Sequence, residues 1–174
     1  MIDPKRAYVA LIPAFILLVA GCGQQDSPAQ DVTDPAVSLP KVPLEQLETD
    51  AAPRSQGGNC SLDTINGQPV ATASVGAGEE AIFVGWVGDA EGQVPLEAKL
   101  VLTGDSGAYA APVQTGTERP DVVAALGKPG LASSGFGVST ALSVEPGTYR
   151  VSIVMGAAPV VQCQFDVNLE LAAR

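Results

Sequence analysis

An alternation of apolar and polar residues near the C-terminal end is the clearest pattern in the chain. Every odd position from 161 to 169 is apolar, and every even position between them is polar. A period of two predicts a β-strand with one buried face. The same period predicts a strand at 149–155, where Tyr149, Val151, Ile153 and Met155 share one face. We expect the residues at 156–159 to turn the chain between these two strands.

Shorter apolar segments between Gly and Pro residues predict six more strands. They lie at 60–64, 70–75, 81–87, 96–103, 108–113 and 136–144. Dipeptides such as Asn66-Gly67 and Pro146-Gly147 supply the positive φ values and rigid corners that turns require. Seven or eight short strands within residues 59–174 predict an all-β fold, in which two sheets pack as a β-sandwich.

One segment interrupts the strand pattern. Pro120 stands near a first helical position, Asp121 falls in the first turn, and Gly127 follows the segment as a stop signal. A short helix is therefore expected at 120–126, inside a long crossover at 115–135. Such a crossover either covers the end of a sandwich or carries binding residues, and the sequence leaves both interpretations open.

The N-terminal segment has the features of a targeting signal. Lys5 and Arg6 precede the apolar residues 7–21, which end in Val19-Ala20-Gly21-Cys22. Fifteen residues at about 1.5 Å each are too short to span a bilayer comfortably. This segment resembles the signal peptide of bacterial lipoproteins, in which the cysteine thiol receives a diacylglycerol and becomes the new N-terminus. An ordinary secretory signal with an incidental cysteine is the alternative.

The lipoprotein resemblance implies a signal peptide at 1–21 and a lipidated, palmitate-carrying Cys22 that anchors the protein to a membrane. Gly23 follows the cysteine, whereas the family's inner-membrane retention signal is Asp at this position. In a two-membrane host the resemblance therefore implies attachment to the outer membrane. The periplasmic face is the expected side, and exposure on the cell surface is the other.

Residues 22–58 have the composition of a tether. They contain five prolines and six acidic residues, and they contain no aromatic residue. Such a segment cannot bury a core, so we expect a disordered linker between the lipid and a domain at 59–174.

The remaining cysteines, Cys60 and Cys163, are an even pair in an exported chain. An oxidising compartment favours a disulfide between them, which would close a loop of about a hundred residues. The chain has no histidine and no C-x-x-C motif, so the usual zinc ligands and the usual redox motif are missing. We expect neither a metal nor a cofactor.

The charge balance excludes one class of partner. The formal net charge is −10, and removal of residues 1–21 leaves 7 basic and 18 acidic residues, a net charge of −11. Such a surface repels nucleic acid, which needs clusters of Lys and Arg. An acidic surface attracts cationic partners or Ca²⁺, or it serves solubility alone.

Four short segments carry a resemblance to the immunoglobulin-like module of bacterial envelope and surface-associated proteins. They are Gly85-Trp86-Val87, Arg119-Pro120-Asp121-Val122, Ser134-Gly135-Phe136 and Pro146-Gly147-Thr148-Tyr149. The resemblance spans about 65 residues and implies an immunoglobulin-like β-sandwich with Trp86 in the core near the disulfide and Tyr149 at a corner. It assigns no activity, because such folds serve many functions.

Catalytic motifs are missing from the sequence. A Ser-His-Asp triad needs a histidine, and no G-x-S-x-G elbow surrounds Ser106, Ser133 or Ser134. Close carboxylate pairs such as Asp89 with Glu91 fall in predicted turns, where solvent keeps their chemistry ordinary. We therefore expect a protein that is not an enzyme. The candidate residues for ligand or partner contact are Trp86, Asp89, Glu91, Arg119 and Asp121.

Two of these candidates have a structural interpretation as well. We expect Arg119 and Asp121 to pair and to orient the crossover. The leading functional hypothesis is a non-catalytic, membrane-anchored lipoprotein with a binding or assembly domain that contacts an envelope protein. The alternatives are a periplasmic inhibitor or exclusion factor acting on an envelope protein, and a carbohydrate-binding or carbohydrate-modifying protein.

Overall fold

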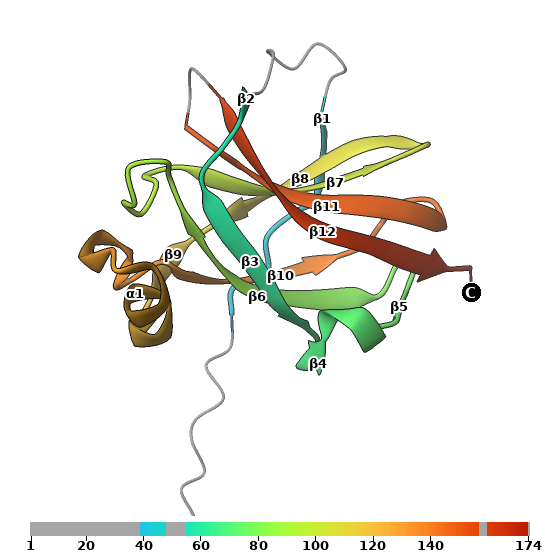
Figure 1. The fold of residues 1–174 in the computed structure, drawn as a ribbon. Coiled ribbons are helices and arrows are strands. Elements are labelled where there is room, and N and C mark those ends of the chain that lie inside the picture. Colours follow the sequence, from blue (N-terminus) through green and yellow to red (C-terminus); the bar gives the residue numbers. More distant parts are fainter. Residues whose placement is uncertain (1–38, 48–54, 157–159, 174) are drawn as a thin grey trace, which may run out of the picture. The chain divides into compact units, whose positions relative to one another are not determined.

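Two β-sheets packed face to face make up the fold (Figure 1). The computed structural model describes residues 39–47, 55–156 and 160–173. The seven-stranded sheet has the order β1 (Glu45–Leu47), β8 (Gly107–Val113), β7 (Ala98–Gly104), β11 (Gly147–Met155), β12 (Val161–Ala172) and β2 (Ser55–Gln56), and β5 (Val75–Gly76) also pairs with β12. The five-stranded sheet has the order β4 (Gln68–Pro69), β3 (Asn59–Ile65), β6 (Glu80–Gly88), β10 (Gly135–Ala141) and β9 (Thr115–Thr117). The predicted all-β sandwich is confirmed.

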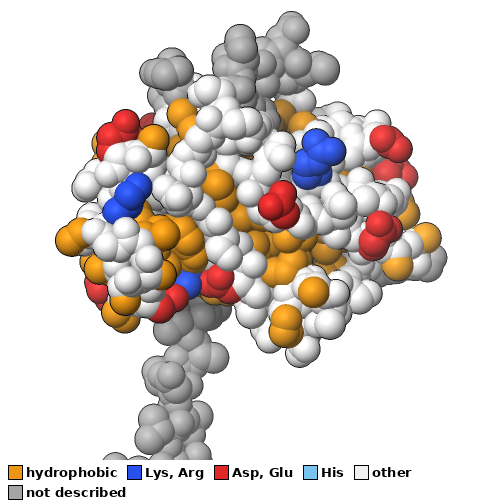
Figure 2. All heavy atoms as spheres, in the orientation of Figure 1, with side chains coloured by type: hydrophobic (Ala, Val, Ile, Leu, Met, Phe, Trp, Pro, Cys, Tyr) orange, Lys and Arg blue, Asp and Glu red, His pale blue; other side chains and the backbone are white. Residues whose placement is uncertain are grey.

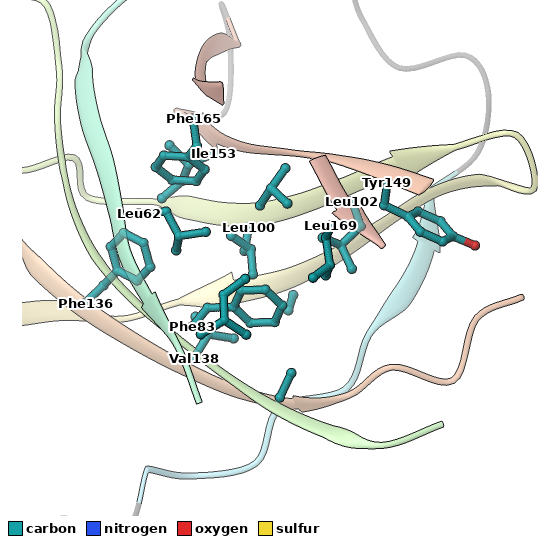
Figure 3. Packing of buried hydrophobic residues seen from close by; sticks show 14 of the residues in the cluster. Leu62, Phe83, Leu100, Leu102, Phe136, Val138, Tyr149, Ile153, Phe165 and Leu169 are labelled. Atoms are coloured by element: carbon teal, nitrogen blue, oxygen red, sulfur yellow. The ribbon is translucent and has the colours of Figure 1, made fainter. Parts of the chain in front are cut away.

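Side chains from the inner faces of both sheets form the core. Phe83 and Phe136 come from the five-stranded sheet, and Leu100 and Ile153 come from the seven-stranded sheet (Figure 3). Each of the four is at most 1% exposed. Removal of this apolar surface from water is the main stabilising contribution to the fold.

Strand β12 follows the predicted alternation, and it also contains a bulge. Phe165, Leu169 and Leu171 are buried, while the even positions between them are exposed. Val167 pairs with Val151 and Gln164 pairs with Ser152, so Phe165 and Asp166 are two extra residues on β12. An insertion of two residues preserves the alternation of sides, which is why the sequence pattern passes through the bulge unbroken.

The predicted crossover helix is present as α1 (Pro120–Leu126), which ends at Gly127 with φ 65°. A 3₁₀ helix, η2 (Pro129–Leu131), follows and buries Leu131 completely. Figure 1 shows α1 at one end of the sandwich, beside β9. None of the helices in the described ranges is long and apolar enough to cross a membrane.

The predicted disulfide is present and joins the two sheets. Cys60 lies on β3 and Cys163 lies on β12, and their Cα atoms are 6.2 Å apart. The bond therefore links one strand of each sheet across the edge of the sandwich.

Several predicted strands differ from the observed ones in their bounds, and β9 lies within the predicted crossover 115–135. The predicted strand 70–75 is instead the 3₁₀ helix η1 (Val70–Thr72) followed by the two-residue strand β5. The strand predicted at 136–144 ends at Ala141, and the one predicted at 96–103 begins at Ala98. In the first case Pro69 removes a backbone donor next to the turn, so the chain leaves the sheet after only two paired residues of β4.

The tether predicted at 22–58 differs from the structure at its C-terminal end. The amide of Val42 donates to the Ser139 carbonyl of β10 at 2.9 Å, β1 pairs with β8, and β2 pairs with β12. Apolar residues explain this pairing, because Val42 and Leu44 pack against the core. The predicted signal peptide and Cys22 lie outside the described residues.

Candidate functional site

The loop after β6, the crossover and the end of β11 lie at one end of the sandwich. The first loop, 89–97, connects β6 with β7, the crossover 118–134 connects β9 with β10, and the chain leaves β11 at Gly156 on the same side. The Gly156 amide donates to the Glu97 carbonyl at 3.1 Å, which ties the end of β11 to the first loop. We call this region the loop end.

Backbone and carboxylate hydrogen bonds close the first part of the loop at 89–97. The Gln93 amide donates to Asp89 Oδ1 at 2.7 Å, and the Asp89 amide donates to the Gln93 carbonyl at 2.9 Å. Gly92 has φ 79°, a conformation that glycine adopts without steric cost. The Asp89 side chain is thus part of the turn that shapes the loop.

The crossover supports this loop from one side. Lys128 Nζ donates to the Ala90 carbonyl at 3.4 Å. Gly130 lies so close to the loop that a Cβ atom there would be 2.6 Å from the Gly92 carbonyl oxygen. The close approach shows that the crossover and the loop at 89–97 form one packed unit.

An open pocket of about 590 Å³ lies at the loop end. Its volume is in the range of small-ligand and side-chain pockets. The apolar part of the lining is Pro95, Leu96, Met155 and Val161, together with Ala90 and Gly156, and the acidic part is Asp89, Glu91 and Glu97. Met155 is buried at 3% exposure, whereas Leu96 is fully exposed.

Comparison with known protein families, with curated proteins and with solved structures finds no match to this chain.

The side chains that line the pocket are carboxylates and apolar groups, which are suited to binding a ligand. Its lining contains no hydroxyl, thiol, amine or guanidinium side chain, so carboxylates are the ionisable groups there. Across the described ranges no three Cys, Asp or Glu side chains come together as a metal-binding group. Carboxylates beside apolar side chains attract a ligand that combines positive charge with apolar surface.

The structure brings Asp89 and Glu91 together at the pocket and places Arg119 and Asp121 elsewhere. Arg119 donates to both carboxylate oxygens of Asp121, from Nε at 2.9 Å and from Nη2 at 2.7 Å. Its Nη1 donates to Asp63 of β3 at 2.8 Å. The expected pairing of Arg119 and Asp121 is present, and Asp63 extends it into an ion-pair cluster that fixes the crossover to the five-stranded sheet.

Charge and hydrogen bonding shift two pKa values in this cluster. The hydrogen bonds from Arg119 lower the pKa of Asp121 to about 2, from an ordinary value of 3.8. The hydrogen bond to Asp121 in turn raises the pKa of Arg119. Within this cluster Arg119 pairs with both carboxylates, and these pairs hold the crossover to the five-stranded sheet.

Trp86 does not lie in the core, contrary to the expectation from the sequence. Along β6 the inward positions are Phe83, Gly85 and Val87, so Trp86 falls on the outer face of the five-stranded sheet. It is half-buried there, in a row with Ile82 and Val84, each more than a third exposed. Sequence reasoning placed a large aromatic residue inside by its size, while the alternation along the strand decides its side.

The sequence predictions missed the apolar part of the pocket. Leu96 was assigned to a strand, yet it stands two residues before β7 begins and is fully exposed. Met155 was correctly assigned to the buried face of its strand, and its position at the end of β11 makes it the floor of the pocket. The usable signal was the order of strands, because the loops that follow β6 and β11 reach the same end of a sandwich of this topology.

On the face of the molecule that Figure 2 shows, acidic side chains lie at several separate places. Figure 2 shows acidic and basic side chains scattered over the visible face, with apolar side chains exposed between them. The pocket combines three carboxylates with apolar side chains in one lining.

Proposed function

We propose that this chain is a non-catalytic lipoprotein, anchored through Cys22 to the bacterial outer membrane, whose β-sandwich binds a protein of the cell envelope at the loop end. The lipoprotein signal at Val19-Ala20-Gly21-Cys22 supports the anchor. The open pocket beside Asp89, Glu91 and Leu96 supports the binding role.

The strand order supports an immunoglobulin-like sandwich as the framework. The short strands β1, β2, β4 and β5 are left out of the comparison. Immunoglobulin strands A, B, C, C′, D, E, F and G then correspond, in chain order, to β3, β6, β7, β8, β9, β10, β11 and β12. With this assignment the two sheets have the orders A-B-E-D and C′-C-F-G, as in immunoglobulin domains.

A corner tyrosine adds to this support. Tyr149 lies near the start of β11, is 1% exposed, and donates from its hydroxyl to the Glu145 carbonyl at 2.7 Å. A tyrosine at the start of strand F that bonds a few residues upstream is a feature of immunoglobulin folds. Two features depart from the antibody pattern: the disulfide joins the strands that correspond to A and G, and Trp86 lies outside the core.

The position of the pocket is the observation on which the proposed function rests. In antibody variable domains the B–C and F–G loops at one end of the sandwich bind the antigen. The corresponding loops of this chain follow β6 and β11, and the pocket is lined by residues of the first loop and by the flanks of the second, Met155, Gly156 and Val161. A pocket at the end that corresponds to the antigen-binding end of antibody variable domains supports a role in recognition.

The test is site-specific photocrosslinking of the full chain in the membrane of a two-membrane bacterial host. A benzophenone amino acid replaces Leu96 at the pocket, and in a matched strain it replaces Asp105 in the β7–β8 turn at the opposite end. We expect one envelope protein to crosslink at position 96 and to be missing at position 105.

The identity of the crosslinked protein also separates the alternatives. A structural envelope protein supports assembly, whereas an envelope enzyme that loses activity in the adduct supports inhibition. No protein adduct at position 96, or the same adducts at both positions, would contradict the proposal. The lining residues of the pocket include no aromatic side chain, so the structure gives the carbohydrate-binding alternative no specific support.

A further inference from the structure

We propose that the pocket at the loop end accepts a cationic, apolar segment of a partner protein, in which a Lys or Arg stands next to a large apolar residue. This inference rests on the proposed function and specifies the chemistry of the bound partner. Two independent properties of the lining lead to it: the exposed apolar surface and the unbalanced charge.

Apolar side chains form the walls and floor of the pocket. Leu96 is fully exposed at the pocket, while Met155 is buried beneath it and Val161 is partly covered. When an apolar group of a ligand packs on an exposed leucine, apolar surface is removed from water, and this burial favours binding. The unbranched Met155 adapts its shape to such a group.

The charges at the pocket favour a cation. Asp89, Glu91 and Glu97 line it, and no basic side chain does. Asp89 accepts a hydrogen bond from the Gln93 amide within its own turn, whereas Glu91 and Glu97 are exposed. The nearby Lys128 lies outside the lining and directs Nζ to the Ala90 carbonyl at 3.4 Å. Glu91 and Glu97 are therefore the carboxylates offered to a ligand.

Both properties belong to one opening, so the ligand needs positive charge and apolar surface on adjacent groups. A peptide segment with Lys or Arg beside Leu, Ile, Phe or Met has this combination, and the aliphatic stems of Lys and Arg add further apolar surface. The pocket is open, and residues of the loop at 89–97 supply most of its lining, so a ligand reaches it directly from solvent. Opposite charges on the two partners also speed their encounter.

The test is selection from a library of random 12-residue peptides displayed on phage. The bait is the full-length protein in phosphatidylcholine vesicles, and vesicles without protein remove the peptides that bind lipid. We expect the enriched peptides to carry Lys or Arg next to a large apolar residue. Affinity is then measured for one enriched peptide against the protein and its variants by fluorescence anisotropy.

Two double variants that each remove two negative charges test the electrostatic contribution to peptide affinity. Glu91→Gln combined with Glu97→Gln should weaken binding about tenfold, because two exposed charge pairs are lost. Asp105→Asn combined with Glu145→Gln makes the same change at the opposite end of the sandwich and should leave affinity within about twofold. Leu96→Ser should also weaken binding, and its full exposure means that the fold does not depend on it.

The outcomes separate this inference from the proposed function. Enrichment of neutral or acidic peptides that depend on Leu96 but not on Glu91 and Glu97 overturns the cationic partner and leaves binding at the pocket in place. If no enriched peptide depends on Leu96, both the inference and binding at the pocket are wrong.

Discussion

At the scale of single residues, Arg119 connects parts of the chain that are far apart in sequence. Two of its hydrogen bonds go to Asp121, two residues away, and one goes to Asp63, 56 residues away. A planar guanidinium satisfies both carboxylates at once, which a lysine at this position would not do in the same geometry. The start of α1 is thereby held to β3.

The lowered pKa of Asp121 predicts a defined pH dependence. Its pKa is about 2 in the folded chain and near 3.9 in an unfolded chain, so its contribution to stability is complete above about pH 4 and is lost as the pH falls towards 2. Asp121→Asn should therefore lower the urea midpoint at pH 5 to 7, and the difference from wild type should shrink between pH 4 and 2. A difference that stays constant from pH 2 to pH 7 would contradict this assignment.

The residue contacts differ in how far the sequence could predict them. The pairing of Arg119 with Asp121 is local, and the pairing of Cys60 with Cys163 was expected from an even count of cysteines in a chain predicted to be exported. Asp63 could not be predicted as the third partner, because only the packing of the crossover on β3 brings it near. The exposure of Leu96 could not be predicted either, because an apolar residue beside a strand is expected to be buried.

At the scale of elements, the crossover was predictable because its signals are local. Pro120 and Gly127 mark the start and the end of α1 within seven residues of each other. The short strands β1, β2 and β5 were not predictable, since two or three residues carry no periodic pattern. They form because a neighbouring strand offers unpaired backbone groups, which is a property of the assembled sheet.

The contact between the crossover and the loop at 89–97 gives a prediction for Gly130. A Cβ atom at this position would lie 2.5 Å from Gln93 Nε2 and 2.6 Å from the Gly92 carbonyl oxygen. Gly130→Ala should cost about 1 to 3 kcal/mol of unfolding free energy, as overpacking does, and should speed hydrogen exchange in α1. Urea unfolding and exchange mass spectrometry measure the two effects.

A second substitution serves as the control for Gly130→Ala. Gln93→Ala removes the side-chain part of the clash and leaves the Gly92 carbonyl in place. The double variant should therefore recover only part of the lost stability. Full recovery would show that the backbone approach is looser than the structure indicates, and an unchanged Gly130→Ala variant would contradict the close packing itself.

At the scale of the whole molecule, the disulfide links the two sheets across 103 residues of sequence. Closing a loop of that length stabilises a protein by about 4 to 5 kcal/mol in the chain-entropy model. Replacing Cys60 and Cys163 together by Ser should lower the melting temperature by about 15 °C, as read by circular dichroism. The double variant avoids a free thiol. Wild type in a reducing agent should melt close to the variant, and an unchanged melting curve would contradict a stabilising role.

The sandwich itself was predictable as a whole, while its N-terminal boundary was not. Alternation in β12 and along most of β11 predicts strands with one buried face, and the short apolar segments between Gly and Pro residues predict the remaining strands of the two sheets, β6 included, although β6 carries apolar residues on both faces. Residues 39–47 have two prolines and no strict alternation of apolar and polar positions, yet Val42 and Leu44 join the core and Lys41 pairs with Glu80. The apolar residues of this segment alternate with prolines and polar residues at irregular spacing, so they form no pattern that predicts a strand.

For the proposed lipid anchor on Cys22, that boundary limits how far the domain stands from a bilayer. Because pairing to β10 already begins at Lys41 and Val42, the covalent path from a lipid on Cys22 to the sandwich is set by the residues before position 41, and it does not run to position 58. At about 3.4 Å per residue, the nineteen residues from Cys22 to Lys41 reach at most about 65 Å. A tether that ended at residue 58 would have roughly twice this maximum length. With the proposed lipid on Cys22, a partner of the sandwich must therefore lie within that distance of the membrane surface plus the length of the domain itself.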